Sequence, residues 1–416
     1  MLFLPTQFGK HFWPNFSFVY GLRLDYLSPT VYLTDIFIVL IFLFFFPKLL
    51  FLIKTINKKY LVAFGLFLLC ALVGIMGSKN PLAGFYGIIK FLECSFLVVF
   101  VVDNFKKFNQ RILFFSFLIG IVFESLLAFF QYFNQGSVGG IFYFFGERAF
   151  NAQTPGIANA SINGQLFLRP YATFSHPNVL AGFLVIAMLY LFLLFKNKQR
   201  IYLLTGIFLG TISLLLTLSR TAIFLWIISI AILFGISFVK KYKNRFSNRR
   251  FIVSATLALI LIVSSYFVFQ NSFLLQRFSL TKLSDESLVQ REQLINQSFL
   301  MIKKNPVFGV GINNFFNNLS FSNTQLEITL IQPVHNIFLL ILSETGLTGF
   351  IFFAYLFYKM MCSIIYSFSE KEGKYLLLLV LTVIFLGFFD HYFLTIQQGQ
   401  IMLSLILGTA FAYKKS

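Results

Sequence analysis

Long apolar runs, separated by short polar segments, dominate the pattern of hydrophobic and polar positions along the chain. A helix needs about 20 predominantly apolar residues to cross the hydrocarbon core of a bilayer, and eleven runs are close to that length. The pattern therefore predicts an all-α polytopic membrane protein, in which residues 1–416 form one integral membrane domain with about 11 (11–12) transmembrane helices. The predicted spans are residues 31–53, 60–77, 82–102, 112–133, 178–195, 201–218, 221–239, 251–270, 335–358, 375–391 and 398–413.

Three segments stand apart from this pattern. Residues 1–30 are too interrupted by polar residues for the apolar region of a signal peptide. Their aromatic residues predict a segment that lies along the membrane interface like an amphipathic anchor, and a span here would be the twelfth. Residues 134–177 and 271–334 are predicted as the first and the large extracytoplasmic loops. In the large loop, apolar residues recur at near-helical spacing until Asn305-Pro306, which is expected to end a helix.

Composition supports the membrane assignment and excludes other classes. Hydrophobic residues make up 58% of the chain and charged residues 11%, whereas a soluble domain has about 25% charged residues. A soluble protein, a disordered protein and a nucleic-acid-binding domain are excluded on this ground, so no nucleic-acid partner is expected. Three cysteines lie in apolar runs without the spacing of a disulfide framework or a metal site, namely Cys70, Cys94 and Cys362.

The distribution of positive charge predicts the orientation of the spans. The chain carries 33 Lys and Arg residues against 14 Asp and Glu residues, a net charge of +19. Of the 33, 20 fall in one set of alternate loops and in the last residues of the chain. Cytoplasmic loops carry the excess of Lys and Arg, which predicts a cytoplasmic C-terminus, an outer N-terminus and long loops on the outer face.

Two clusters of polar residues fall on the predicted outer face before residue 240. In the run from Arg169 to Asn178, His176-Pro177-Asn178 can break the backbone and cap the next helix. Arg169 is either an interfacial residue of this helix entry or a ligand for an anion at a helix N-terminus. Arg220 lies in the short turn between two apolar runs. It either reaches the lipid headgroups or binds phosphate through its planar guanidinium.

Two further clusters follow Arg291. Gly309-Val-Gly311, followed by Asn313, allows a close backbone approach or only a sharp turn, and it lacks the third glycine of a dinucleotide fingerprint. His335-Asn336 opens a span at its outer end. His335 is either a general base or an ordinary interfacial residue. Glu344, nine residues on, is out of phase with His335 at 100° per residue, and we expect it to be a partner inside the bundle.

The residue types in these clusters suggest a reaction without a metal. No acidic pair with metal-ligand spacing occurs on the outer side, so no metal and no cofactor are expected. Arginines can hold phosphates and stabilise the charge of a leaving group, while a histidine takes a proton. This combination suits the attack of a hydroxyl on a lipid-linked pyrophosphate donor.

The ordered set of motifs resembles the O-antigen ligase/polymerase superfamily. RPYATFSHPNVLAGFL is followed by LSRTA, by an Arg with NPVFGVGINNF, and by HNIFLLILSETGLTG. The resemblance covers residues 165–350, and the first 160 residues match only as apolar spans. The chain departs from the ligases in its eleven predicted spans, where twelve are usual, and in its outer N-terminus.

The resemblance implies a bacterial cytoplasmic (inner) membrane enzyme of the GT-C type with its active site on the outer face. Such enzymes transfer a glycan from undecaprenyl pyrophosphate to lipid A-core, to a growing polysaccharide or to another hydroxyl acceptor. The implied reaction is metal-independent and inverting. The residues that match the essential ones are Arg220, Arg291 and His335. Residues expected to bind substrate are Arg169, His176, Asn178, Gly309, Gly311, Asn313 and Asn336.

A flippase or transporter for lipid-linked glycans is the alternative, and a structural scaffold is a third class. A transporter should place charged groups near the middle of the bilayer, and the candidates are Asp35, Lys90, Glu93 and Glu124. Lys90 and Glu93 are three residues apart on one predicted helix, so they can neutralise each other. A scaffold leaves the position of Arg220 unexplained.

Overall fold

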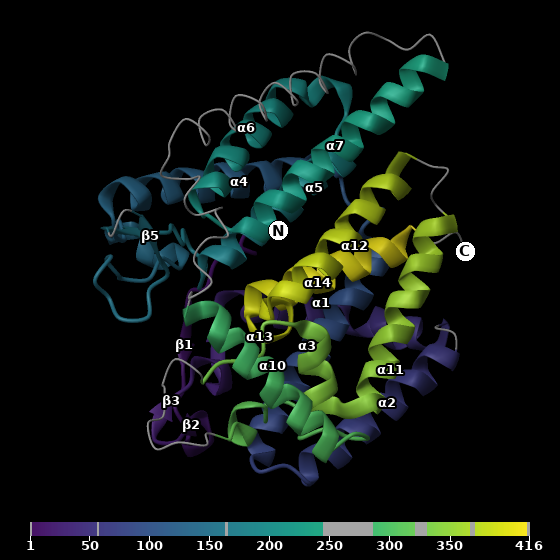
Figure 1. Ribbon diagram of the computed structural model, residues 1–416. Helices are drawn as coiled ribbons and strands as arrows, with labels where there is room; N and C mark the ends of the chain where they lie inside the picture. The colour runs from purple at the N-terminus through teal and green to yellow at the C-terminus, as the bar shows by residue number, and fades with distance from the viewer. Residues whose placement is uncertain are drawn as a thin grey trace. The chain divides into compact units, whose positions relative to one another are not determined.

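The computed structural model describes residues 2–55, 58–162, 165–243, 286–320, 331–366 and 371–413. Helices account for most of these residues (Figure 1), and the all-α prediction is confirmed. The long helices are α1 (Leu33–Thr55), α2 (Lys58–Met76), α3 (Pro81–Asn104), α4 (Gln110–Asn134), α5 (Pro177–Leu194), α6 (Arg200–Leu216), α7 (Arg220–Lys243), α10 (Glu286–Lys304), α11 (Ile337–Tyr366), α12 (Lys371–Phe389) and α14 (Gln397–Ala412). A short helix, α13 (Tyr392–Thr395), precedes α14.

Ten of the eleven predicted spans coincide with these helices, and the run 251–270 lies outside the described residues. Among the described residues, seven helices are long and apolar enough to cross a membrane, and α6 and α7 contain shorter apolar stretches. A polytopic membrane protein is therefore confirmed, and the exact number of spans stays a prediction.

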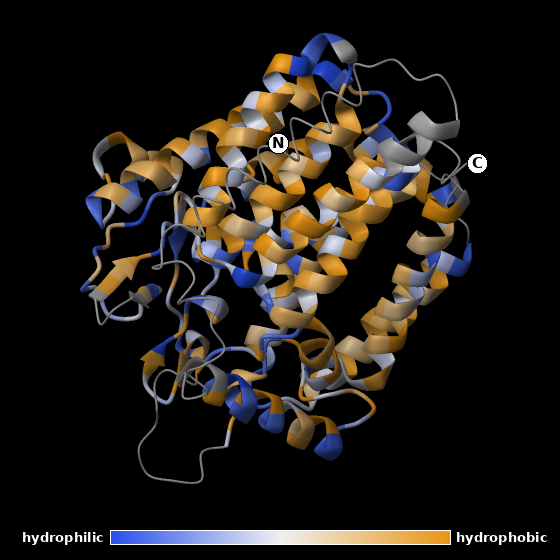
Figure 2. Ribbon diagram, turned by 45° about the horizontal axis from the view of Figure 1, so that its top comes forward, coloured by the Kyte–Doolittle hydropathy of each residue, from blue (hydrophilic) through white to orange (hydrophobic). Residues whose placement is uncertain are grey.

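The helices consist mostly of hydrophobic residues (Figure 2), and many of their large apolar side chains are exposed. Phe44 on α1 is 87% exposed, Phe133 on α4 is 76% exposed and Met76 at the end of α2 is 72% exposed. Contiguous apolar surface on this scale is rare on soluble proteins. These side chains are therefore suited to contact lipid, which accounts for part of the high Phe content.

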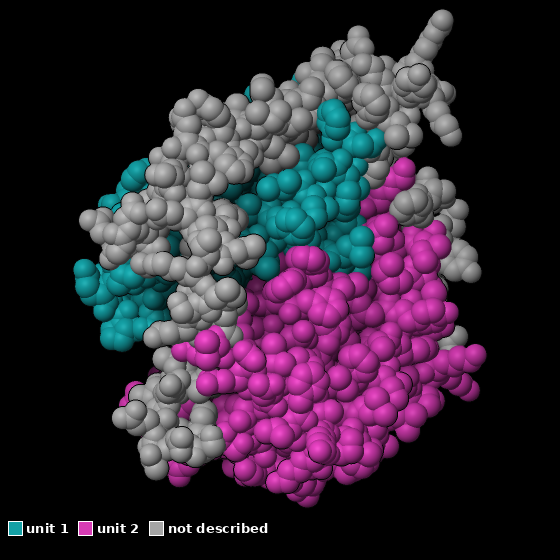
Figure 3. Space-filling view, in the orientation of Figure 1, with its two compact units in different colours: residues 1–7, 108–282, 378–382 teal, residues 8–107, 283–377, 383–416 magenta. Residues whose placement is uncertain are grey.

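The chain divides into two compact units (Figure 3). Unit 1 comprises residues 1–7, 108–282 and 378–382, and within it α4 packs against α5 and α6. Unit 2 comprises residues 8–107, 283–377 and 383–416. In unit 2, α3 packs against α14, α2 packs against α11, and α10 packs against α11.

Residues 2–32 form a small β layer and not an amphipathic helix. Strand β1 (Gly9–His11) pairs with β4 (Thr30–Tyr32), and β2 (Phe18–Val19) pairs with β3 (Leu22–Arg23). Val19, Leu24 and Leu27 lie with Phe316 and Ile331 in one buried cluster of unit 2, and the aromatic residues Phe16 and Tyr26 pack against it. Whether the segment also contacts the membrane interface stays a prediction.

The two long loops carry short elements. Residues 134–177 contain the strands β5 (Asn159–Ile162) and β6 (Gln165–Leu168), which pair with each other. In the large loop, α10 ends directly before Asn305-Pro306, as the apolar spacing predicted. Residues 271–285 and 321–330 of that loop lie outside the described residues.

Candidate functional site

Three polar residues meet in unit 2 where α11 begins and α12 ends. His335 lies two residues before α11, and Asp390 and His391 directly follow α12. One nitrogen of each imidazole and one oxygen of the carboxylate all lie within 4.8 Å of one another. His335 is half-buried, whereas Asp390 and His391 are buried. We call these three residues the outer-end cluster, because the distribution of positive charge predicts the outer face of the membrane for this end of the helices.

The carboxylate of Asp390 lies between the two histidines. Its Oδ1 is 3.5 Å from Nδ1 of His335 and accepts a hydrogen bond of 2.8 Å from the backbone N–H of His391. On the other side of the His335 ring, Nε2 lies 3.3 Å from Oε1 of Gln332. A carboxylate facing Nδ1 favours the proton on that nitrogen. The amide oxygen of Gln332 can only accept a hydrogen bond, so Nε2 becomes able to accept a proton when an acceptor substrate displaces this amide.

His391 supports the cluster from inside the protein. Its ring lies 4.9 Å from the ring of His335 and makes an edge contact with Tyr26, at 5.6 Å between centroids. Its Nδ1 shares a hydrogen bond of 2.7 Å with the hydroxyl of Thr395. The pKa of His391 is lowered to about 3, mainly by burial. The charges of His335 and Arg291 also lower this pKa, whereas the charge of Asp390 raises it. His391 is therefore a neutral imidazole at pH 7.

This lowered pKa predicts that the folded protein loses stability on mild acidification. An unfolded histidine has a pKa near 6.5, so below that pH the unfolded chain binds a proton that the folded chain does not. The free energy of unfolding then falls by about 2 kcal/mol between pH 7 and pH 5. Tm, measured by thermal unfolding in detergent, should decrease more steeply with falling pH for the wild type than for His391→Asn. Equal slopes would contradict the assignment.

Arg291 reaches the same region from α10. It is half-buried, and its positive charge is one of those that lower the pKa of His391. The position of α10 is fixed by apolar packing, because Leu294 and Met301 share a buried cluster with Val334 and Leu340 beside the start of α11. Arg291 therefore lies in the same unit as His391 and near enough for its charge to act on that imidazole.

Asp390 and His391 were not predicted as site residues. The sequence does contain a signal, because an acidic residue and a histidine follow each other at the outer end of an apolar run. Ionisable residues at the end of a span have a functional or pairing role more often than those in a solvated loop. The neighbouring residues in the sequence do not show which other helix end lies beside Asp390 and His391.

The Gly309-Val-Gly311 segment forms a turn that packs tightly against Glu344 and Ser78. Gly309 and Gly311 have φ angles of +68° and +94°, which side chains strongly disfavour. A Cβ on Gly309 would lie 2.4 Å from the carbonyl carbon of Glu344, and one on Gly311 would lie 2.7 Å from Cβ of Ser78. The space beside both glycines is thus filled by protein.

Asn313, Asn336 and Glu344 all bond to nearby backbone. The Asn313 amide donates to the carbonyl of Ala83 at 3.1 Å. Asn336 caps α11, because its side-chain oxygen accepts from the N–H groups of Phe338 and Leu339 at 2.9 and 3.0 Å. Glu344 accepts from the backbone N–H of Phe315 at 3.3 Å. The prediction that Glu344 is a partner inside the bundle is confirmed.

The remaining predicted residues lie in unit 1. His176 caps α5, since its Nδ1 accepts from the N–H of Asn178 at 3.1 Å. Arg169 is buried and donates to the carbonyl of Thr217 at 2.7 Å and to the side-chain oxygen of Asn178 at 2.8 Å. The structured start of α5 that the sequence predicted is therefore held by the hydrogen bonds of Arg169.

Arg220 is the first residue of α7, directly after a tight turn in which Leu218 has a φ of +52°. Its side chain is exposed. It makes no hydrogen bond or ion pair with another residue in the part of the chain that the structure describes. The guanidinium is thus available to a ligand, and the N-terminus of a helix favours negative charge.

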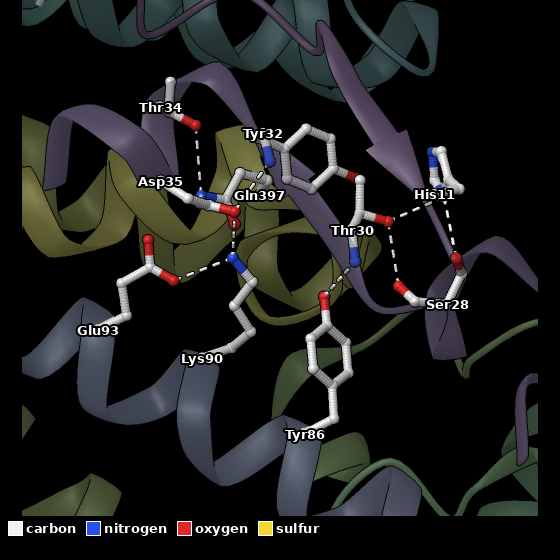
Figure 4. A network of polar contacts seen from close by, with 10 residues as sticks. All are labelled: His11, Ser28, Thr30, Tyr32, Thr34, Asp35, Tyr86, Lys90, Glu93 and Gln397. Carbon is white, nitrogen blue, oxygen red and sulfur yellow. Dashed lines mark hydrogen bonds and ion pairs between the residues drawn. The ribbon is translucent and has the colours of Figure 1, made fainter. Parts of the chain in front are cut away.

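The charged residues considered for transport bond within the protein. Lys90 lies 2.9 Å from the carboxylates of both Asp35 and Glu93, as Figure 4 shows. The prediction that Lys90 and Glu93 pair is confirmed. Glu124 accepts hydrogen bonds from the N–H and the hydroxyl of Thr173 at 3.1 and 2.9 Å.

The outer-end cluster is also a group that could hold a metal, since two histidines and an aspartate are common metal ligands. Its members come from two distant segments, so no spacing in the sequence predicts such a site.

Comparison with known proteins supports the resemblance in the sequence. Residues 205–354 match the family model described as O-Antigen ligase. The matched segment includes Arg220, Arg291 and His335. No curated protein matches the sequence.

Proposed function

We propose that this protein is an envelope glycosyltransferase that uses a lipid-linked donor, because residues 205–354 match the family model described as O-Antigen ligase. In this proposal it moves a glycan from undecaprenyl pyrophosphate to an acceptor hydroxyl of lipid A-core, of a polysaccharide or of another glycan. The reaction takes place at the outer face of the bacterial cytoplasmic membrane, with the C-terminus in the cytoplasm. The observation that carries the proposal is the approach of the carboxylate of Asp390 to the imidazole of His335.

His335 acts as the general base. The acceptor O–H gives its proton to Nε2 of His335, and the oxygen forms a bond to the anomeric carbon of the donor sugar. The bond from that carbon to the pyrophosphate oxygen breaks, and undecaprenyl pyrophosphate leaves with the electron pair. Attack opposite to the leaving group inverts the anomeric configuration. Asp390 stabilises the imidazolium that forms, because its carboxylate faces Nδ1 at 3.5 Å.

Arg291 of unit 2 holds the pyrophosphate in this proposal, and Arg220, which lies in unit 1, stays the second phosphate ligand that the sequence predicts. A guanidinium bonds two phosphate oxygens at once and keeps its charge at any physiological pH. Both side chains are accessible, since Arg291 is half-buried and Arg220 is exposed. As charge develops on the leaving oxygen, these groups stabilise the transition state more than the ground state.

The residues expected to bind substrate contribute mostly by shaping the site. Gly309, Gly311 and Asn313 fix the turn after α10, and Asn336 caps the helix that follows His335. In unit 1, a second set determines how the chain enters α5 and α7, namely Arg169, His176 and Asn178.

A transfer assay with purified protein tests the proposal. We expect an undecaprenyl-pyrophosphate-linked glycan to be joined to a hydroxyl acceptor, with inverted configuration and with the same rate after treatment with EDTA. Loss of activity in EDTA and its return with a divalent cation would contradict the metal-free mechanism and assign the metal to the outer-end cluster. Movement of the donor across proteoliposomes without transfer would instead support the transport alternative.

A further inference from the structure

Unit 2 contains a cavity of about 1200 Å³. It is lined by residues of α1, α2, α3, α11 and α14 together with parts of the N-terminal β layer. Tyr26 and Thr395, which both contact His391, line it next to the outer-end cluster. Asp103, Lys106 and Lys107 line it at the other end of α3.

The length of the cavity is close to the thickness of the hydrocarbon core of a membrane. Along α3 its lining extends from Tyr86 to Asp103, which at 1.5 Å per residue is about 26 Å. The hydrocarbon core of a bilayer is about 30 Å thick. Its walls are rich in aromatic rings packed on one another, such as Phe64 on Phe91 and Phe67 on Phe352. An extended hydrocarbon chain is the ligand that fits such walls.

A charged group on the cavity wall separates a short outer part from a longer inner part. Lys90 bonds to two carboxylates, those of Asp35 and Glu93, and its ammonium also lies 5.8 Å from the ring centre of Tyr32. Figure 4 shows these groups with Gln397 at the start of α14. Because two negative charges surround one positive charge, this group does not attract an anion. The inner part, from Lys90 to Asp103, is about 20 Å long.

The inner end of the cavity has an excess of positive charge. Lys48 and Lys107 both pair with Asp103, the latter at 2.8 Å, and Lys106 lies 4.8 Å from the ring centre of Tyr413. Three lysines and one aspartate give a net charge of +2. Lys106 and Lys107 are exposed as well as lining the cavity. The distribution of Lys and Arg along the chain assigns this end of α3 to the cytoplasmic side.

We propose that the inner part of this cavity binds an anionic phospholipid of the cytoplasmic leaflet. The phosphate is held by Lys106 and Lys107, and the acyl chains extend along α3 toward Lys90. Basic pockets between transmembrane helices on the cytoplasmic side are suited to anionic lipid headgroups. About 20 Å of apolar wall accommodates acyl chains that must cross half of a 30 Å core. This site is distinct from that of the glycan donor, whose pyrophosphate is proposed to bind at the outer end.

The test compares two double variants of the full-length protein. Lys106→Gln/Lys107→Gln removes the excess charge at the cavity, and Lys196→Gln/Lys198→Gln removes the same charge from another predicted cytoplasmic loop, where both lysines are exposed. Binding of phosphatidylglycerol and of phosphatidylcholine with the same acyl chains is measured by native mass spectrometry in detergent. Each lysine near the surface contributes about 1 kcal/mol to the binding of an anionic lipid, so the first variant should bind phosphatidylglycerol about 25-fold more weakly.

The control variant should bind phosphatidylglycerol like the wild type, and the wild type should prefer it to phosphatidylcholine. A third variant, Ala63→Trp, narrows the cavity at a lining position and should weaken binding of both lipids. Equal losses in the two lysine variants, no preference for the anionic lipid, or unchanged binding in Ala63→Trp would overturn the proposal. Displacement of phosphatidylglycerol by undecaprenyl phosphate would also overturn it, because it would assign the cavity to the glycan donor.

Discussion

His335→Ala is expected to lower the rate of glycan transfer by 10²- to 10⁴-fold, which is the usual contribution of a general base. The hydroxyl of a sugar is a weak nucleophile until its proton is removed, and Nε2 of His335 can take this proton once the acceptor displaces the amide of Gln332. The loss should fall on kcat, because the base acts in the transition state and contributes little to donor binding. Initial rates at saturating donor measure it.

A matched control and a second variant make this test specific. His11→Ala removes another histidine of unit 2, whose Nδ1 bonds to the hydroxyls of Ser28 and Thr30, and it should leave kcat within a few-fold of the wild type. Asp390→Asn keeps the shape of the carboxylate but removes its charge. It should lower kcat less than His335→Ala does, because the imidazole is kept and only the charge that stabilises the imidazolium is lost. Full activity of His335→Ala would exclude His335 as the base.

Local sequence patterns predicted the helices well, because a span is defined by composition over about 20 consecutive residues. The capping of α5 by His176 and the end of α10 before Asn305-Pro306 are equally local features, and both are confirmed. Arg220 was located correctly in the turn between α6 and α7 for the same reason.

Features that depend on contacts between distant residues were not predictable in this way. Asp390 approaches His335 only because α11 begins and α12 ends at the same place, and no spacing rule connects positions 55 residues apart. The turn at Gly309 was ambiguous, since its tight contact with Glu344 is made by another part of the chain. The short strands between Gly9 and Tyr32 belong to a segment whose Tyr26 packs on Phe316, and composition cannot show this distant partner.

The replacement of Arg291 by lysine is expected to reduce transfer by 10²- to 10³-fold, although the charge is kept. That is the usual loss when one group that stabilises the charge of a transition state is removed. A lysine ammonium is a point charge and cannot bond two phosphate oxygens in one plane. Lys303→Gln, at the exposed end of the same helix, serves as the control and should be active. Activity of Arg291→Lys within a few-fold of the wild type would show that only the charge matters.

The same substitution at Arg220 determines whether the two arginines serve one pyrophosphate. If both hold the same leaving group, their effects are coupled, and the double variant should lose clearly less activity than the product of the two single losses. If the arginines bind different ligands, the two losses should multiply. Transfer rates of Arg220→Lys, Arg291→Lys and the double variant, measured with one donor, complete this cycle. If the losses multiply, only Arg291 holds the pyrophosphate. Of the two arginines, Arg291 is the one whose charge acts on His391 of the outer-end cluster.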